Sequence, residues 1–249
     1  MANPANVFER AHHQRIARIL ESLDPDVLRN HACWFGGGTA VSLRLGEFRE
    51  SLDIDFLISA AMAFRSLRAH LRGAVDLGPL TRPGLAAFRL TRELRLDQYG
   101  IRGWVETDAS PIKIEFVHEA RVRLNSPNKP DHVCGIASLS WEDLTLCKLI
   151  ANSDRWRDDI TFARDVIDLA HMHLLPRRLA PALQRANDAY GDHVATDLSH
   201  AIDALRERDR WLQRCLDALS IREPPAAIIQ KLRLLERRLR DATANRRIG

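Results

Sequence analysis

The first half of the chain changes between helical and strand-like spacing of its apolar residues. From Val7 to Leu23 the apolar positions recur every three or four residues, which predicts an amphipathic helix. In Leu52–Ile58, acidic and apolar residues alternate before the run becomes apolar, which is typical of a strand. Helical spacing returns over residues 59–71. Between residues 85 and 116, arginine alternates with apolar residues in the runs AAFRL, ELRLDQYGIRGWVET and PIKIEFV, which favours an antiparallel sheet with one solvated face.

The second half has helical periodicity almost throughout. It opens on Ser140, a plausible helix cap with Asp143 three residues later. Breaks are expected at Leu175-Pro176, near Gly191 and at Pro224-Pro225. We therefore predict an α+β protein: an α/β domain over residues 1–139 and an all-helical domain over residues 140–249.

Composition narrows the class of protein. The 249 residues are 45% hydrophobic and 28% charged, which excludes a mostly disordered chain. The N-terminal segment has no apolar core of a signal peptide, and no run of about 18 apolar residues occurs, so we expect a cytoplasmic protein without a membrane span. The four cysteines are far apart and form no CxxC pair, which argues against a zinc cluster or a disulfide framework.

Positive charge is concentrated near the C-terminus. The formal net charge is +4, yet residues 204–249 alone contain 12 lysines and arginines against 6 acidic residues. Such a basic segment suits a polyanionic partner such as RNA. A solvated amphipathic helix explains the same pattern equally well, so both readings stay open.

Candidate chemistry begins with the acidic strand. Because side chains alternate faces along a strand, Asp53 and Asp55 project to one face while Ile54 packs into the core. Two such carboxylates suit Mg²⁺, which takes one or two protein carboxylates plus phosphate oxygens. In PIKIEF, Lys113 and Glu115 share a face in the same way. If the two strands are neighbours, Glu115 becomes a third carboxylate, and three carboxylates can hold two metal ions.

A glycine run lies just before this strand. Gly36, Gly37 and Gly38 allow a ligand to approach the backbone, and a helix starting at Thr39 would direct N–H groups at a phosphate. Metal ligands and a phosphate cradle within about twenty residues make a workable NTP site. A triple glycine alone is more often a turn, and an isolated DxD is more often a solvated edge. The order and spacing of the parts favour the functional interpretation.

The segment FGGGTAVSLRLGEFRESLDIDFL resembles the signature of the polymerase-β-like nucleotidyltransferase superfamily, in which a glycine pair opens a helix before an acidic strand. It resembles the AbiEii/AbiGii-type nucleotidyltransferase toxins more closely, through the GGTA turn and the run RESLDID at residues 49–55. The later segments LTLCKLIAN, around Lys148, and ARDVIDL, around Asp165 and Asp168, resemble the helical motifs of that family. The resemblance covers residues 34–170 and implies a nucleotidyltransferase-type mixed sheet.

The resemblance also implies roles and partners. Lys148 would contact the phosphates of an NTP, and Asp165 would orient it or help the acceptor, with Asp159 in reserve for that role. The cofactor would be Mg²⁺ or Mn²⁺, and the acceptor RNA, such as tRNA, or protein. A cognate antitoxin is an implied partner. On pattern alone, Lys148 is an ordinary surface lysine of a helix.

One departure from the superfamily leaves a second hypothesis open. The third carboxylate is aspartate in much of the superfamily, whereas this chain has the longer Glu115. The chain is therefore either an active enzyme or a catalytically degenerate module that binds nucleotide or RNA. The sequence does not identify the NTP, the acceptor or the oligomeric state.

Overall fold

The computed structural model describes residues 7–128 and 131–244 and divides the chain into two compact units. The first comprises residues up to Glu47 and Ser51–Ser140. The second comprises Phe48–Glu50 and the residues from Trp141 onwards. We predicted a single division between residues 139 and 140. The structure adds the short segment 48–50 to the helical unit, which no pattern in the sequence indicated.

The first unit is built on a five-stranded sheet in the order β1-β2-β5-β4-β3. Strands β2 and β5 run parallel, and the other neighbours pair antiparallel, so the sheet is mixed as predicted. A separate two-stranded ribbon pairs β6 with β7. The bounds are β1 Trp34–Gly36, β2 Ile54–Ile58, β3 Arg95–Leu96, β4 Gly100–Val105, β5 Ile112–His118, β6 His132–Val133 and β7 Ile136–Ala137.

One predicted strand does not form. In the run AAFRL, only Arg89 and Leu90 make isolated bridges, to Asp76 and Val105. Because the run begins with two alanines, it has little apolar surface to bury against a neighbouring strand. The period-two pattern was read correctly for β4 and β5, where buried residues alternate with more exposed ones from Ile101 to Val105 and from Ile112 to Val117.

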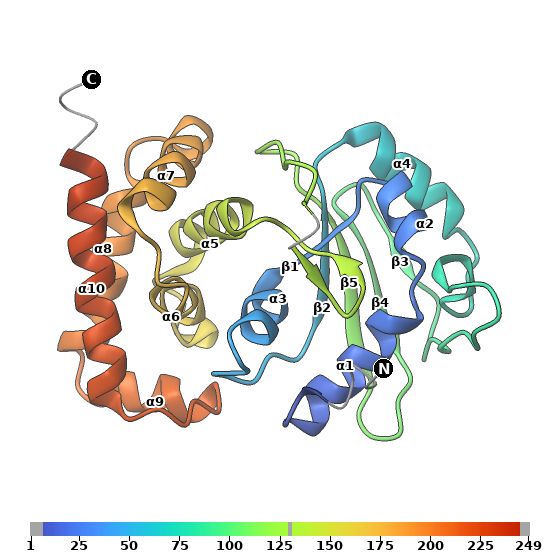
Figure 1. Cartoon of the computed structure of the whole chain (residues 1–249), viewed down its shortest axis with the longest axis horizontal. Helices are drawn as coiled ribbons and strands as arrows, with labels where there is room; N and C mark the ends of the chain where they lie inside the picture. Colours follow the sequence, from blue (N-terminus) through green and yellow to red (C-terminus); the bar gives the residue numbers. More distant parts are fainter. Residues whose placement is uncertain (1–6, 129–130, 245–249) are drawn as a thin grey trace. The chain divides into compact units, whose positions relative to one another are not determined.

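Helices cover both sides of this sheet, and Figure 1 shows α2 and α4 on one side and α3 on the other. On one face, Ile54, Phe56, Ile114 and Phe116 are fully buried, and the two phenylalanine rings stack with centroids 5.2 Å apart. The polar residues that alternate with these four side chains project to the opposite face of the same strands. The helices of this unit are α1 Ala11–Ser22, α2 Pro25–Asn30, α3 Gly37–Arg44, α4 Ala61–His70 and the 3₁₀ turn η2 Gly78–Leu80.

The second unit is helical, as predicted, and its breaks fall at the expected residues. Helix α7 begins at Pro176 and α10 begins at Pro225, because proline fits the first turn of a helix. Helix α7 also contains Pro181 in its interior and ends before Gly191, which has a positive φ of 91°. Helix α10 buries one apolar stripe, formed by Ile228, Leu232, Leu235 and Leu239. The elements are α5 Trp141–Arg155, η3 Asp159–Thr161, α6 Arg164–His171, α7 Pro176–Tyr190, α8 Val194–Glu207, α9 Trp211–Ala218 and α10 Pro225–Ala244. No helix in the described parts of either unit is long and apolar enough to cross a membrane.

Candidate functional site

A row of paired residues crosses the sheet of the first unit on its polar face. Asp55 of β2 pairs with Gly36 of β1 on one side and with Glu115 of β5 on the other. Glu115 pairs in turn with Arg102 of β4. Residues paired across neighbouring strands project to the same face of a sheet. The strand of Glu115 therefore lies beside the strand of Asp55, which is the condition on which a role for Glu115 depends.

Asp53 lies one residue before β2, outside the hydrogen-bonded ladder. Its backbone is held by a side chain instead: the Thr39 Oγ1 atom lies 2.5 Å from the Asp53 carbonyl oxygen. Thr39 is fully buried in α3. Its hydroxyl therefore supports the backbone of Asp53. Binding of a nucleotide at Thr39 remains a prediction.

The three glycines differ in what they do. Helix α3 begins at Gly37, two residues before the predicted start at Thr39. Gly36 is buried, with Leu57 and Leu139 directly against it, so it serves close packing. Binding of a phosphate at Gly36 remains a prediction. Gly37 is half-buried and has a positive φ of 67°, a conformation that favours glycine.

Gly37 also lies against the candidate metal ligand. A Cβ atom placed on it would overlap the Asp55 carboxylate. The first N–H groups of an α-helix have no partner within the helix, and its N-terminus carries partial positive charge. The N-terminus of α3 and the Asp55 carboxylate therefore occupy one place, where a phosphate and a cation can be bound together.

Replacing Gly37 by alanine is expected to displace Asp55 and to lower nucleotide transfer by about tenfold or more. The matched control is Gly73→Ala, because Gly73 has a similar φ of 75° but no atom within 4 Å of an added Cβ. Both variants bear the strain of a left-handed residue, on the order of 1 kcal/mol. Thermal unfolding measures the effect of backbone strain, which the two variants share, and the transfer assay measures the effect of displacing Asp55. Equal activity of the two variants would contradict the contact between Gly37 and Asp55.

Glu115 is engaged by two cations. Its Oε1 accepts a hydrogen bond from Arg102 Nε at 2.8 Å, and its Oε2 lies 2.5 Å from Lys113 Nζ. Over residues 7–128 and 131–244, no three His, Cys, Asp or Glu side chains converge closely enough to hold a metal ion. Asp53 and Asp55 fit a magnesium site of one or two protein carboxylates. Glu115 as a third metal ligand remains a prediction, because Arg102 and Lys113 occupy both of its oxygens.

The second unit contains Lys148 and Asp165, and it brings them together. Lys148 Nζ lies 2.9 Å from Asp165 Oδ1 and 2.6 Å from Asp168 Oδ2. Lys148 is only 5% exposed, so the alternative of a surface lysine is wrong. The reserve candidate Asp159 pairs instead with Arg208. The contact with a phosphate remains a prediction, because Lys148 is occupied by two carboxylates.

Two arginines complete this buried cluster, and the sequence did not identify their part in it. Arg49 binds Asp168 through two hydrogen bonds, Nε to Oδ1 at 2.6 Å and Nη2 to Oδ2 at 3.0 Å. Arg155 binds Asp165 in the same bidentate way. The spacing of the two aspartates, three residues apart on α6, was the available signal, since such residues share a helix face.

The charges in the cluster determine its ionisation. Burial alone would raise the pKa of Asp165 and of Asp168. The charges of Lys148 and Arg155 nevertheless hold the pKa of Asp165 below its ordinary value, and those of Arg49 and Lys148 do the same for Asp168. Both aspartates are therefore ionised at neutral pH.

The first unit also has a cleft of about 440 Å³. None of the predicted site residues lines it, so we do not place the nucleotide there. Its lining side chains are Arg15, Arg18, Ala87, Phe88, Arg89, Glu106, Thr107 and Asp108.

Comparison with known proteins identifies the family of the chain. Residues 18–244 match the family model described as nucleotidyl transferase AbiEii toxin, type IV toxin–antitoxin system. A crystal structure of an H. pylori protein assigned as a nucleotidyltransferase has 18% identity and a TM-score of 0.47, covering 92% of this chain and 95% of that one. The structure of JHP933 from Helicobacter pylori has 16% identity and a TM-score of 0.49, covering 98% and 97%. No curated protein matches the chain. Since the family model spans most of its length, the chain belongs to the AbiEii nucleotidyl transferase toxin family of type IV toxin–antitoxin systems.

Proposed function

We propose that this chain moves a nucleotide from an NTP onto an acceptor in a metal-dependent reaction at the polar face of the β1–β2–β5 sheet. The observation that carries the proposal is the position of Asp55, which lies between the N-terminus of α3 at Gly37 and the strand of Glu115. Asp53 stands two residues earlier, directly before the first residue of the same strand. Acidic ligands and helix N–H donors in one place suit a metal-bound triphosphate.

Asp53 and Asp55 would hold Mg²⁺ or Mn²⁺, with phosphate oxygens completing the coordination. When bound, the metal ion would neutralise the negative charge that develops on the phosphate oxygens. In the transfer, the acceptor hydroxyl would give its proton to Glu115 or to water while its oxygen forms a bond to the α-phosphorus. The bond between that phosphorus and the α–β bridging oxygen breaks, and pyrophosphate leaves with the bonding electrons. Glu115 is kept as the candidate third carboxylate, which would have to exchange its contacts with Arg102 and Lys113 for this role.

Binding of the triphosphate is proposed to use two further groups. The backbone N–H groups of Gly37 and Gly38, at the start of α3, would donate to phosphate oxygens. Lys148 would supply a compact positive charge for the phosphates, and Asp165, whose Oδ1 lies 2.9 Å from Lys148 Nζ, would orient it. Because Asp168 also contacts Lys148, binding of a phosphate would have to compete with that carboxylate.

Family membership supports a biological role as the toxin of a toxin–antitoxin or phage-defence pair. The proposed acceptor is RNA such as tRNA, with protein as the other class. The excess of arginine and lysine in residues 204–249 suits an RNA phosphate backbone. An antitoxin protein is the corresponding partner.

The ion pairs of Glu115 favour a second candidate function. With Arg102 and Lys113 on its two oxygens, the described structure has no ready three-carboxylate group. A module that binds nucleotide or RNA without turnover would have the same geometry. The two functions differ in whether the label of an NTP becomes attached to the acceptor.

Transfer of label from α-³²P NTPs tests the proposal. The purified protein is incubated with each NTP, total RNA and Mg²⁺, and RNA and protein are separated on denaturing gels. We expect label on the acceptor with at least one NTP, reduced to background by EDTA and restored by excess Mg²⁺ or Mn²⁺. NTP binding without transfer would select the binding module, and the absence of both would overturn each candidate function.

A further inference from the structure

The sheet fixes the backbone at Asp55 but not at Asp53, so other contacts must hold the backbone at Asp53. The pairing of β2 with β5 begins at Ile54, so the sheet holds Asp55 on both sides but leaves Asp53 just outside the ladder. A ligand that must be placed within a fraction of an ångström depends on the groups around it. The structure shows which groups hold the chain at this point.

His13 of α1 contacts the segment that leads into Asp53. The Ser51 backbone N–H donates to His13 Nε2 at 3.0 Å, and the ring is fully buried. On the other side of the segment, Thr39 Oγ1 lies 2.8 Å from Ser51 Oγ and 2.5 Å from the Asp53 carbonyl oxygen. The residues before Asp53 are therefore held from α1 and from α3 at once.

Glu47 determines which ring nitrogen of His13 carries the proton. Its Oε1 lies 2.8 Å from His13 Nδ1, so Nδ1 carries the proton and Nε2 is left to accept from Ser51. Burial lowers the pKa of His13, although the hydrogen bond to Glu47 opposes this, and the neutral ring is the form that accepts. Arg10 and His12, which also face the ring, lower its pKa further.

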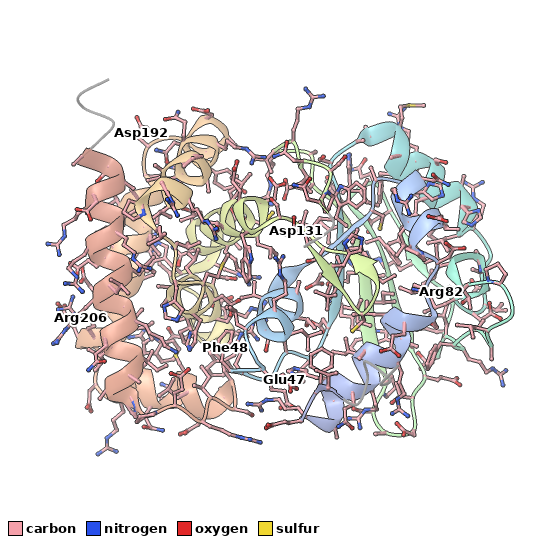
Figure 2. All side chains as sticks on the ribbon, viewed as in Figure 1. Glu47, Phe48, Arg82, Asp131, Asp192 and Arg206 are labelled. Atoms are coloured by element: carbon pink, nitrogen blue, oxygen red, sulfur yellow. The ribbon has the colours of Figure 1, made fainter. Side chains whose placement is uncertain are left out.

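The backbone of Glu47 is itself unusual. Glu47, labelled in Figure 2, has a φ of 57°, in the left-handed region that favours glycine. Its carboxylate also accepts the backbone N–H groups of Glu9 at 2.6 Å and Arg10 at 3.1 Å. Strained residues persist where the surrounding contacts over-determine them, and they concentrate at functional sites.

We propose that His13 is a positioning residue of the candidate site, which fixes Asp53 by accepting the Ser51 N–H while Glu47 holds the ring. The inference rests on the proposed function, since it takes Asp53 as a metal ligand. His13 does not touch the nucleotide; it acts through the backbone of residues 51–53.

Two substitutions test the roles of the two ring nitrogens of His13 separately. In His13→Gln the amide oxygen reaches the position of Nε2 and still accepts from Ser51. In His13→Asn the shorter amide reaches only the position of Nδ1, so it contacts Glu47 and leaves the Ser51 N–H without its acceptor. Both variants lose the ring, so a role in packing alone affects them alike.

Mn²⁺ is the probe, and its binding is measured without turnover from the electron paramagnetic resonance signal of the free ion. We expect His13→Asn to weaken Mn²⁺ binding about tenfold and His13→Gln to stay within about twofold of the wild type, the size of effect that one hydrogen bond carries. Deuterium exchange at the Ser51 amide is expected to be slow in the wild type and His13→Gln, and fast in His13→Asn. Equal Mn²⁺ binding by the two variants, whether strong or weak, would overturn the proposal.

Asp53→Asn serves as the reference for the metal site. If it binds Mn²⁺ as tightly as the wild type, the metal site of the proposed function is wrong. If it binds weakly while the two His13 variants behave alike, only the role of His13 is wrong. Should His13→Asn not fold, ¹⁵N NMR of the wild type decides: an unprotonated Nε2 supports the proposal, and a protonated Nε2 contradicts it.

Discussion

Replacing Asp55 by asparagine should lower the rate of nucleotide transfer about a thousandfold while the protein remains folded. Asparagine has nearly the same shape as aspartate, so the contact with Gly37 and the pairing with Glu115 are retained. The lost charge removes one of the two carboxylates proposed to hold the metal. A metal ion stabilises a phosphoryl transition state by several kcal/mol, and about 4 kcal/mol corresponds to a factor of a thousand.

The measurement is the initial rate of label transfer at saturating NTP, with circular dichroism to verify the fold. Asp26→Asn is the matched control, because Asp26 is an exposed aspartate of the same unit, in α2, with 71% of its side chain accessible. The control should transfer label at the wild-type rate. A loss of less than about tenfold in Asp55→Asn would exclude Asp55 as a metal ligand.

Replacing Asp168 by asparagine should destabilise the protein by about 3–5 kcal/mol at pH 7. Asp168 is fully buried and pairs with both Arg49 and Lys148. Its removal leaves a buried positive charge without compensation, which is the costly way to break a buried ion pair. Urea unfolding at pH 7 measures the loss, and Asp209→Asn, whose side chain is 94% exposed in the same unit, should change stability by less than about 0.5 kcal/mol.

The difference between the wild type and Asp168→Asn should depend on pH in a definite direction. The pKa of Asp168 is lower in the folded protein than its ordinary value of 3.8. A carboxylate of this kind contributes stability above its unfolded pKa and loses that contribution as the pH falls through its folded pKa. The difference in unfolding free energy between the wild type and Asp168→Asn should therefore be largest at pH 7 and become smaller below about pH 4. A difference in unfolding free energy that stays constant down to pH 2 would show that the charge of Asp168 is unimportant.

Arg49→Lys keeps the positive charge but loses the bidentate contact with Asp168. It should lower the free energy of unfolding by less than Asp168→Asn does.

Much of the fold was readable from local pattern, because burial on one face imposes a period on the sequence. Alternation in residues 52–58 and 112–116 placed Ile54 and Ile114 inside and left Asp55 and Glu115 outside, as the structure has them. Proline and glycine marked the helix ends in the second unit for equally local reasons. The run AAFRL was misread because the period of two is necessary for a strand but does not supply apolar surface to bury.

The candidate site was predictable as a set of residue types, but not as a geometry. The sequence placed Asp53, Asp55 and Glu115 on strands, yet the register that pairs Asp55 with both Gly36 and Glu115 depends on how strands far apart in the chain align. The pairing of Glu115 with Arg102 likewise required β4 to lie beside β5, whereas Lys113 lies two residues before Glu115 on the same strand. No local pattern distinguishes an accessible carboxylate from one held by two cations.

By itself, the sequence determined the α+β class, the helical second half and the acidic strand next to a glycine turn, because each follows from side-chain periodicity or from the backbone freedom of single residues. Only the tertiary structure decided that Arg49 binds Asp168, that Lys148 is buried between two carboxylates, and that His13 holds the segment before Asp53. These contacts join residues between 17 and 119 positions apart in the chain. Their energies depend on burial and mutual orientation, which exist only once the chain has folded.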